Sequence, residues 1–519
     1  MAVGAVAAAA VGMAILYGIV GRGGFRAEDL LAVYREEVKY DNIAIEYPLD
    51  ETLFPPEMVP PTFRWKDSAA GAKAWLIRVD FDDDGPCVLF TARRPHWTPA
   101  SQDWETIKQR SLERDARVLI LGAGRGRSPR VVSRARMSFR TSRDPVEAPL
   151  FYREVILPFI DADKDPSRIR WRFGSIASPE RPPVVLKNLP VCGNCHSFSR
   201  DGATLAMDVD YADSKGSYVI TAVREQMALA TRDIITWDSY APEDGETTFG
   251  LLSQISPDGQ YVVGTVKDKS VFIPRPGLAF SQLFFPVKGI LCVFERQTGQ
   301  FRALPGADDP NFVQSNPTWS PDGKYIVFAR TRAVDLRNTR GQGNVGLTPA
   351  ECEELIKDGK PFQFDLYKIP FNNGAGGTAE PLEGASGNGM SNYFARYSPD
   401  GRWIVFCRAR SYMLLQPDSE LFIIPAEGGQ ARRLRCNTNR MNSWHSWSPN
   451  GKWLVFASKV YSDYTQLCLT HIDERGESTP PVLLEHLTAP DRAANIPEFV
   501  NTRPQAIIKI HEQFLADRQ

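Results

Sequence analysis

Five copies of one short motif recur from residue 198 onward, and they constrain the fold more than any other feature of the chain. Each copy has an aromatic or aliphatic residue, a Ser-Pro-Asp-Gly type turn and then an alternating apolar strand. Proline presets the first dihedral angle of such a turn, and glycine accepts the positive φ that closes a hairpin. The repeat therefore predicts a series of β-hairpins. The copies are FSRDGATLAM from Phe198, ISPDGQYVVG from Ile255, WSPDGKYIVF from Trp319, YSPDGRWIVF from Tyr397 and WSPNGKWLVF from Trp447.

Further strand-and-turn units, such as GILCVFERQTGQFRAL and ELFIIPAEGGQARRL, lie between the copies, which follow one another at about 50 to 80 residues. Four strands per copy suit the blades of a β-propeller, because radial stacking buries both faces of every sheet. Five blades are visible, and residues 168–186 together with NIPEFV near the C-terminus are expected to form a sixth. The sequence predicts an all-β fold with a propeller of about six blades over residues 176–502. The repeated SPDG turn followed by a strand with an aromatic residue resembles the repeat of the TolB-like β-propeller family.

Other segments flank the predicted propeller. An apolar run within residues 1–22 predicts a hydrophobic helix that serves as a signal or a membrane anchor, and residues 23–60 predict a short amphipathic helix and a proline-rich linker. Alternating runs over 61–175, with Trp65 and Trp75, resemble fibronectin type III or immunoglobulin-like modules. This resemblance implies a small β-sandwich. Residues 503–519 predict a C-terminal helix.

One motif has the spacing of a chemical site. VCGNCHSFSRDG places Cys192, Cys195 and His196 in a C-x-x-C-H arrangement. Two cysteines so spaced can each form a thioether to a haem vinyl group, while the histidine reaches the iron from the same side. We therefore predict one haem c, attached in the first blade of the propeller, with His196 as an iron ligand. A metal site, a redox dithiol and a chance occurrence are the alternatives, although no second close Cys or His pair exists to complete a zinc site.

A second iron ligand is suggested by aligning the repeats. His445 in WHSWSPNG stands two residues before Trp447, as His196 stands two residues before Phe198. Equivalent positions in two blades are expected to face the same channel, which makes His445 a candidate for the sixth coordination position. The alternative is a buried histidine satisfied by hydrogen bonds. The competing candidates are Met207, Met441 and Met390.

A wider resemblance concerns the fold and the haem residues. The strings around LKNLPVCGNCHSFSRDG and WHSWSPNGKWLVFASK look like exported bacterial TolB-like propellers that bear one haem-attachment motif, which implies the propeller fold and the haem residues Cys192, Cys195 and His196. Export and haem attachment together predict a periplasmic protein, expected to be held at the inner membrane by its N-terminal helix. A haem c in such a protein predicts electron transfer to a redox partner protein. The alternative is a TolB-type scaffold of an envelope complex with a structural or sensory haem.

Several function classes are disfavoured. The net charge is −1, from 61 basic and 62 acidic residues, so nothing favours a nucleic-acid backbone as a partner. No G-x-S-x-G, H-E-x-x-H or Walker motif is present, which disfavours a hydrolase. Asp161, Asp163 and Asp165 have the initial spacing of a calcium loop, but Pro166 replaces its glycine. The eight cysteines do not suggest a disulfide framework.

Overall fold

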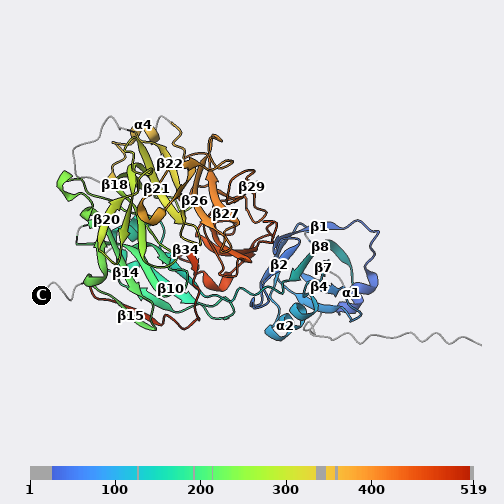
Figure 1. The fold of residues 1–519 in the computed structure, drawn as a ribbon. Coiled ribbons are helices and arrows are strands. Elements are labelled where there is room, and N and C mark those ends of the chain that lie inside the picture. The colour runs from blue at the N-terminus through green and yellow to red at the C-terminus, as the bar shows by residue number, and fades with distance from the viewer. Residues whose placement is uncertain are drawn as a thin grey trace, which may run out of the picture. The chain divides into compact units, whose positions relative to one another are not determined.

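The computed structural model describes residues 26–69, 71–124, 128–190, 193–212, 214–334, 346–356 and 360–514, and the chain forms two compact units (Figure 1). One unit comprises residues up to 145 with 479–482, and the other comprises the remainder from 146. The hydrophobic helix predicted within 1–22 lies outside the described residues. None of the described helices has the length and apolar character that a membrane crossing requires.

The first unit is an immunoglobulin-like β-sandwich. One side has the strand order β5-β4-β7-β8 and the other β1-β3-β6, and β1 links them by pairing antiparallel with β3 and parallel with β8. Trp65 and Trp75 pack edge to face across the core, with ring centroids 5.9 Å apart. The elements are α1 (Ala27–Val33), β1 (Asp41–Tyr47), β2 (Thr52–Phe54), β3 (Phe63–Asp67), β4 (Ala74–Phe81), β5 (Val88–Ala92), β6 (His96–Trp97), α2 (Ser101–Arg110), β7 (Ala116–Ala123) and β8 (Val131–Thr141).

The boundaries of this sandwich differ from those expected. It includes β1 and β2, which lie in the segment 23–60 that was predicted to be helix and linker. It ends by Pro145 rather than at residue 175, because β9 (Leu150–Val155) and β10 (Arg170–Gly174) pair with strands of the propeller. Local alternation of apolar residues predicted the strands but could not assign them to one sheet or another.

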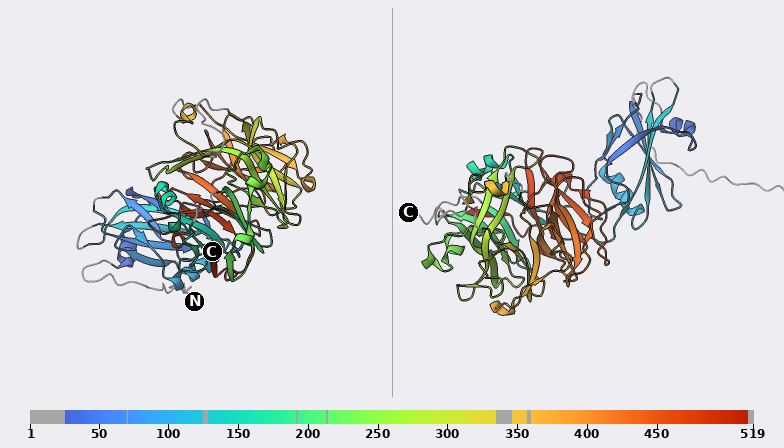
Figure 2. Two further views of the ribbon diagram at one scale, coloured as in Figure 1. Left: turned by 90° about the vertical axis from the view of Figure 1, so that its left-hand side faces the viewer. Right: turned by 90° about the horizontal axis from the view of Figure 1, so that it is seen from above.

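The second unit is a six-bladed β-propeller, which confirms the predicted all-β fold and blade number (Figures 1 and 2). Blade 1 contains β34 (Ala493–Phe499), β9, β10 and β11 (Val184–Lys187); blade 2 contains β12 (Gly193–Phe198), β13 (Thr204–Tyr211), β14 (Ser214–Ala222) and β16 (Ile234–Thr236). Blade 3 contains β17 (Gln254–Ile255), β18 (Tyr261–Pro274), β19 (Gln282–Glu295) and β20 (Gln300–Ala303); blade 4 contains β21 (Phe312–Trp319), β22 (Tyr325–Arg332), β24 (Asp365–Pro370) and β25 (Glu380–Pro381). Blade 5 contains β26 (Ser391–Tyr397), β27 (Trp403–Ala409), β28 (Glu420–Pro425) and β29 (Arg432–Arg433); blade 6 contains β30 (Asn442–Trp447), β31 (Trp453–Ser458), β32 (Gln466–His471) and β33 (Val482–Leu483).

The ring closes by joining distant parts of the chain. The C-terminal strand β34 is the innermost strand of blade 1 and pairs with β9, so that Ala494 lies opposite Glu154. The inner strands β34, β12, β17, β21, β26 and β30 neighbour one another in this order around the central channel. The C-x-x-C-H motif therefore belongs to the second blade in chain order, not the first.

The repeated turns connect each inner strand to the second strand of its blade. In all five copies the glycine has φ between 69° and 74°, and the turn serine donates a hydrogen bond to the Asp or Asn two residues later. One sequence motif thus builds the same geometry five times, and the inner strands present equivalent positions to the channel.

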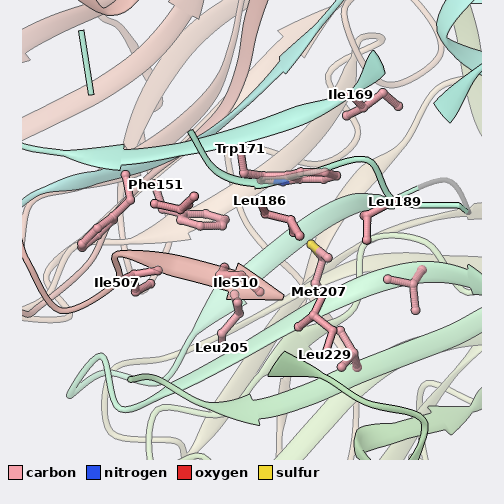
Figure 3. Packing of buried hydrophobic residues seen from close by; sticks show 14 of the residues in the cluster. Phe151, Ile169, Trp171, Leu186, Leu189, Leu205, Met207, Leu229, Ile507 and Ile510 are labelled. Atoms are coloured by element: carbon pink, nitrogen blue, oxygen red, sulfur yellow. The ribbon is translucent and has the colours of Figure 1, made fainter. Parts of the chain in front are cut away.

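A large apolar core lies where blades 1 and 2 meet (Figure 3). Trp171, Leu186 and Leu205 contribute to it, and Met207 is fully buried there with its sulfur directed toward Leu186. Ile510 joins the same core from β35 (Lys509–Glu512), which pairs in parallel with β15 (Gln226–Leu229). The prediction of a C-terminal helix over 503–519 is wrong for the residues described there, 503–514, which contain strand β35 and turns. The remaining α-helices and strand of this unit, among the described residues, are α3 (Phe159–Lys164), β23 (Gly346–Leu347) and α4 (Glu353–Ile356).

Candidate functional site

Strand β12 carries two of the three residues of the predicted site, Cys195 and His196; Cys192 lies outside the described residues. A register irregularity between Gly193 and His196 bends the strand. Gly193 lies so close to Trp171 that a Cβ atom would approach the ring to 2.6 Å. The strand can therefore pass here only because this residue has no side chain.

Cys195 lies in the wall of a pocket at one mouth of the channel. Its side chain is 7% exposed, and its thiol is near the backbone N–H of Leu252 and the carboxyl group of Asp208. Burial raises the pKa of this thiol far above its ordinary value. The thiol is consequently protonated at neutral pH, which makes it a weak nucleophile.

His196 is directed away from that pocket. Its side chain is 1% exposed, and its ring packs edge to face on Phe151 of blade 1 with the centroids 4.7 Å apart. Backbone groups of Phe151 and Ile496 are near the ring, but neither ring nitrogen makes a hydrogen bond of normal geometry. Burial lowers the pKa of His196 to about 3, so the imidazole is neutral at physiological pH.

This geometry does not fit a haem c. Attachment requires that the thiol and the imidazole approach one porphyrin together. Cys195 borders the pocket, whereas His196 is absent from its wall and lies between blades 1 and 2. Among the described residues, no group of three His, Cys, Asp or Glu side chains has the arrangement of a metal site. A haem could be held by both residues only if β12 adopted a different conformation.

The candidate sixth ligands are not brought to His196. His445 occupies the predicted equivalent position in blade 6, but it faces blade 5, where its Nε2 donates a hydrogen bond to Val405 O at 2.9 Å. Its Nδ1 is 3.9 Å from the sulfur of Cys407. Met207 belongs to the apolar core, Met441 is 1% exposed, and Met390 lies outside β26 in the loop that precedes it. Equivalent histidines therefore enter two different spaces between blades rather than one channel.

The pocket beside Cys195, which we call the funnel pocket, has a volume of about 370 Å³. Its walls are mostly apolar and aromatic, and two buried polar atoms on its lining residues, Trp444 Nε1 and Gln282 Oε1, have no hydrogen-bond partner. The aromatic and aliphatic residues of these walls include Phe159, Phe249, Leu251, Phe272, Phe284 and Trp444.

Four charged side chains border the funnel pocket. Asp210 forms an ion pair with Lys215, and Arg153 donates a hydrogen bond to Asn194 Oδ1 at 3.1 Å. Burial raises the pKa of Asp210, and the neighbouring Asp163 raises it further. Two cations and two carboxyl groups balance, so the pocket favours a ligand without a large net charge.

Sequence reasoning missed most of this pocket, although one signal was present. On four inner strands the residue three positions before the aromatic or aliphatic position lines this pocket, as Cys195, Leu252, Trp444 and Ile496. Leu252, Trp444 and Ile496 occupy this position and have positive φ, as Asn316 and Phe394 do. Aligning the repeats at this position would have grouped Cys195 with Trp444 instead of pairing His196 with His445.

Fold and site together define a six-bladed β-propeller with a mostly apolar pocket at a channel mouth. No family model matches the chain. An uncharacterised protein of Agrobacterium fabrum, Atu1656, is 23% identical over 158 residues, which are 27% of this chain and 50% of the relative. The match thus spans only half of that relative.

Solved structures with similarity to the chain include three propeller-sized proteins. A protein of Agrobacterium tumefaciens described as TolB is 16% identical, with 68% of this chain and 98% of that chain covered and a TM-score of 0.34. The periplasmic gluconolactonase of Pseudomonas aeruginosa is 13% identical, with 64% and 82% covered and a TM-score of 0.33. A Bacteroides uniformis protein described as a 6-phosphogluconolactonase is 12% identical, with 68% and 100% covered and a TM-score of 0.37. Values this low carry no inference about activity.

Proposed function

We propose that this protein is an extracytoplasmic binding protein whose funnel pocket takes a flat, mostly apolar organic molecule. One observation carries the proposal: aromatic and aliphatic side chains make up most of the pocket wall, and only a few charged and polar groups lie among them. Pockets with apolar walls and few polar groups are typical of small-molecule sites.

The extracytoplasmic location rests on the sequence. The apolar run over residues 2–20 has the composition of a signal or an anchor, and the resemblance to exported propellers points the same way. Fusing residues 1–26 to a reporter that is active only after export tests this part of the proposal. A reporter retained in the cytoplasm would contradict it.

Ligand binding is tested with the fluorescent probe 8-anilinonaphthalene-1-sulfonate, which is flat and mostly apolar. The protein is expected to enhance the probe's fluorescence with a saturable, one-site binding curve. Leu251→Trp replaces an aliphatic side chain of the partly exposed wall with a bulky indole ring and should weaken binding at least about tenfold. The control Ile508→Trp adds the same ring at a position that is 48% exposed and should bind as the wild type does. Equal binding by all three proteins would contradict the proposal.

A haem c on Cys192 and Cys195 with electron transfer to a redox partner is the second candidate. The observation in its favour is that both ring nitrogens of His196 are buried without a normal hydrogen bond, as an iron ligand would be before loading. This candidate requires His196 to leave the core, since the described conformation does not fit the group. A variant of this candidate is an envelope scaffold protein whose haem is structural or sensory. In that case the haem edge would not be accessible to external reductants, whereas an electron carrier needs an accessible edge.

The haem candidate has a direct test. The protein is produced with haem c maturation machinery, denatured and stained for covalently bound haem. Pigment that survives denaturation and is lost in Cys195→Ser would support the candidate. Colourless protein from mature, exported material would contradict it and would leave the funnel pocket as the candidate site.

A further inference from the structure

The channel has a second mouth, on the side of the repeated turns. A cavity of about 310 Å³ lies there, and we call it the turn-side pocket. Two tryptophans and a tyrosine line it, Trp319, Trp447 and Tyr397, with prolines of four turns around them. On five of the six inner strands, the residue just before the aromatic or aliphatic position also lines this cavity. These residues are Gln254, Thr318, Arg396, Ser446 and Glu498.

Arg396 is a cation without a close anion. Among the described residues, no carboxylate oxygen lies within the 4.0 Å of an ion pair, and the hydrogen bond found for the guanidinium is a long one, 3.5 Å from Nη1 to Ala395 O. Burial lowers the pKa of Arg396, yet a guanidinium remains charged at any physiological pH. The strand backbone is fixed here, because Trp447 Nε1 donates a hydrogen bond to Arg396 O at 3.3 Å.

The other carboxyl groups on this side are occupied. The turn residues Asp201, Asp258, Asp322 and Asp400 each accept a hydrogen bond from the serine of their own turn. Glu498 shares the channel with Arg396 and accepts a hydrogen bond from Phe198 N at 3.0 Å. Burial raises the pKa of Glu498 to about 7, so near neutral pH a large fraction of this group carries no charge to balance the guanidinium.

We propose that the turn-side pocket binds an organic carboxylate, with Arg396 receiving the carboxylate and the aromatic side chains contacting its apolar body. The planar fork of an arginine matches a carboxylate, and a charge-assisted hydrogen bond gains strength in a site with little water. The carboxylate could come from a free acid or from the C-terminus of a peptide, since both present the same group. This pocket is separate from the funnel pocket, so the inference stands without the proposed function.

Isothermal titration with two matched pairs of probes tests the inference on the full chain. One pair is benzoate and benzamide, and the other is N-acetyl-Ala-Phe with a free or an amidated C-terminus. At least one acid should bind about tenfold more tightly than its amide, and the acid that binds identifies the source. Equal affinity within both pairs, or no binding of either acid up to about 10 mM, would overturn the inference.

Substitutions assign the effect to Arg396. Arg396→Ser installs the residue that β12 and β30 carry at the equivalent positions, Ser197 and Ser446, so the fold should tolerate it. Acid binding should fall at least about tenfold, to the level of the amide. Arg433→Ser removes an exposed arginine paired with Glu420 and should bind as the wild type does. Unchanged acid binding by Arg396→Ser would overturn the inference.

A pH series tests the part played by Glu498. The other titratable groups that interact with Arg396 keep their charge state between pH 6 and 8, because burial keeps His196, His445, Cys195, Cys407 and Tyr218 neutral. Acid affinity should therefore rise several-fold from pH 8 to pH 6 as Glu498 loses its charge, and Glu498→Gln should abolish this change. A wild-type affinity independent of pH would exclude Glu498 from the site.

Discussion

His445 Nε2 donates a hydrogen bond of 2.9 Å to the carbonyl oxygen of Val405, and so joins blade 6 to the second strand of blade 5. His196 occupies the equivalent position in blade 2 and packs on Phe151 of the second strand of blade 1. Both imidazoles are buried between blades. Interactions of this kind stabilise neighbouring blades against each other, because a blade contacts little else besides its two neighbours.

Replacing His445 with alanine should lower the free energy of unfolding by about 2–3 kcal/mol, because the Val405 carbonyl loses its donor and a small cavity remains. Blade 5 already carries alanine at this position, Ala395, so the fold itself should persist. Urea unfolding followed by circular dichroism measures the change. His511→Ala, at an exposed position, should change stability by less than about 0.5 kcal/mol. Equal stability of both variants would show that the bond is not stabilising.

The same histidine predicts a dependence of stability on pH. Burial lowers the pKa of His445 from 6.5 to about 3, so below pH 6.5 the unfolded chain binds a proton that the folded chain does not. Stability is therefore lost as the pH falls from 6.5 toward 3, by up to about 1.4 kcal/mol per pH unit for this group. Urea unfolding at pH 6 and pH 5 should show a smaller loss for His445→Ala than for the wild type. An equal loss of stability in both proteins would contradict the assignment of this pH dependence to His445.

Glu498 acts in the opposite direction. Its pKa is raised from 4.5 to about 7, so between these values the unfolded chain releases a proton that the folded chain keeps, and stability falls as the pH rises. Glu498→Gln should therefore be more stable than the wild type by about 1–3 kcal/mol at pH 8 and by little at pH 4.5. Thermal unfolding at both values measures the difference. A stabilisation that did not depend on pH would indicate packing rather than ionisation.

Ring closure depends on β34. A chain that ends at residue 488 lacks the inner strand of blade 1, leaves the β9 edge without its partner strand and should not unfold cooperatively. Limited proteolysis and thermal unfolding measure this effect. Ile508→Ala, at an exposed position in the same C-terminal segment, serves as the control and should unfold as the wild type does. A truncated chain with the same transition as the full one would contradict the closure.

One turn glycine tests the cost of backbone conformation alone. Gly323 has φ of 70°, and a Cβ atom there would meet nothing within 4 Å. Gly323→Ala should therefore lower the free energy of unfolding by about 1 kcal/mol, because the left-handed backbone conformation is the only feature that disfavours the added methyl group. Urea unfolding measures this change. Gly71→Ala, in equally open space without a positive φ, is the matched control and should cost less.

The repeats were sufficient to predict the propeller because each copy contains its own turn, strand and spacing. They also predicted the partnership of NIPEFV with residues around 168–186, which the structure shows as β34 in the sheet of β9, β10 and β11. The same local patterns could not separate β9 and β10 from the sandwich, since strands of both domains alternate in the same way. They also predicted a helix where β35 pairs with β15, because a short strand at the edge of a core is selected by its partner.

The sequence by itself determined that this chain is built from repeated hairpins, and it placed His196 and His445 at the same position of two repeats, with Cys195 next to His196. Only the tertiary structure decided where those side chains are directed. Neighbouring residues of a strand enter different spaces, so Cys195 reaches the funnel pocket while His196 packs between two blades. Spacing along the chain fixes which residues are neighbours, but the curvature of the strand and the packing of the next blade decide which of them meet a ligand.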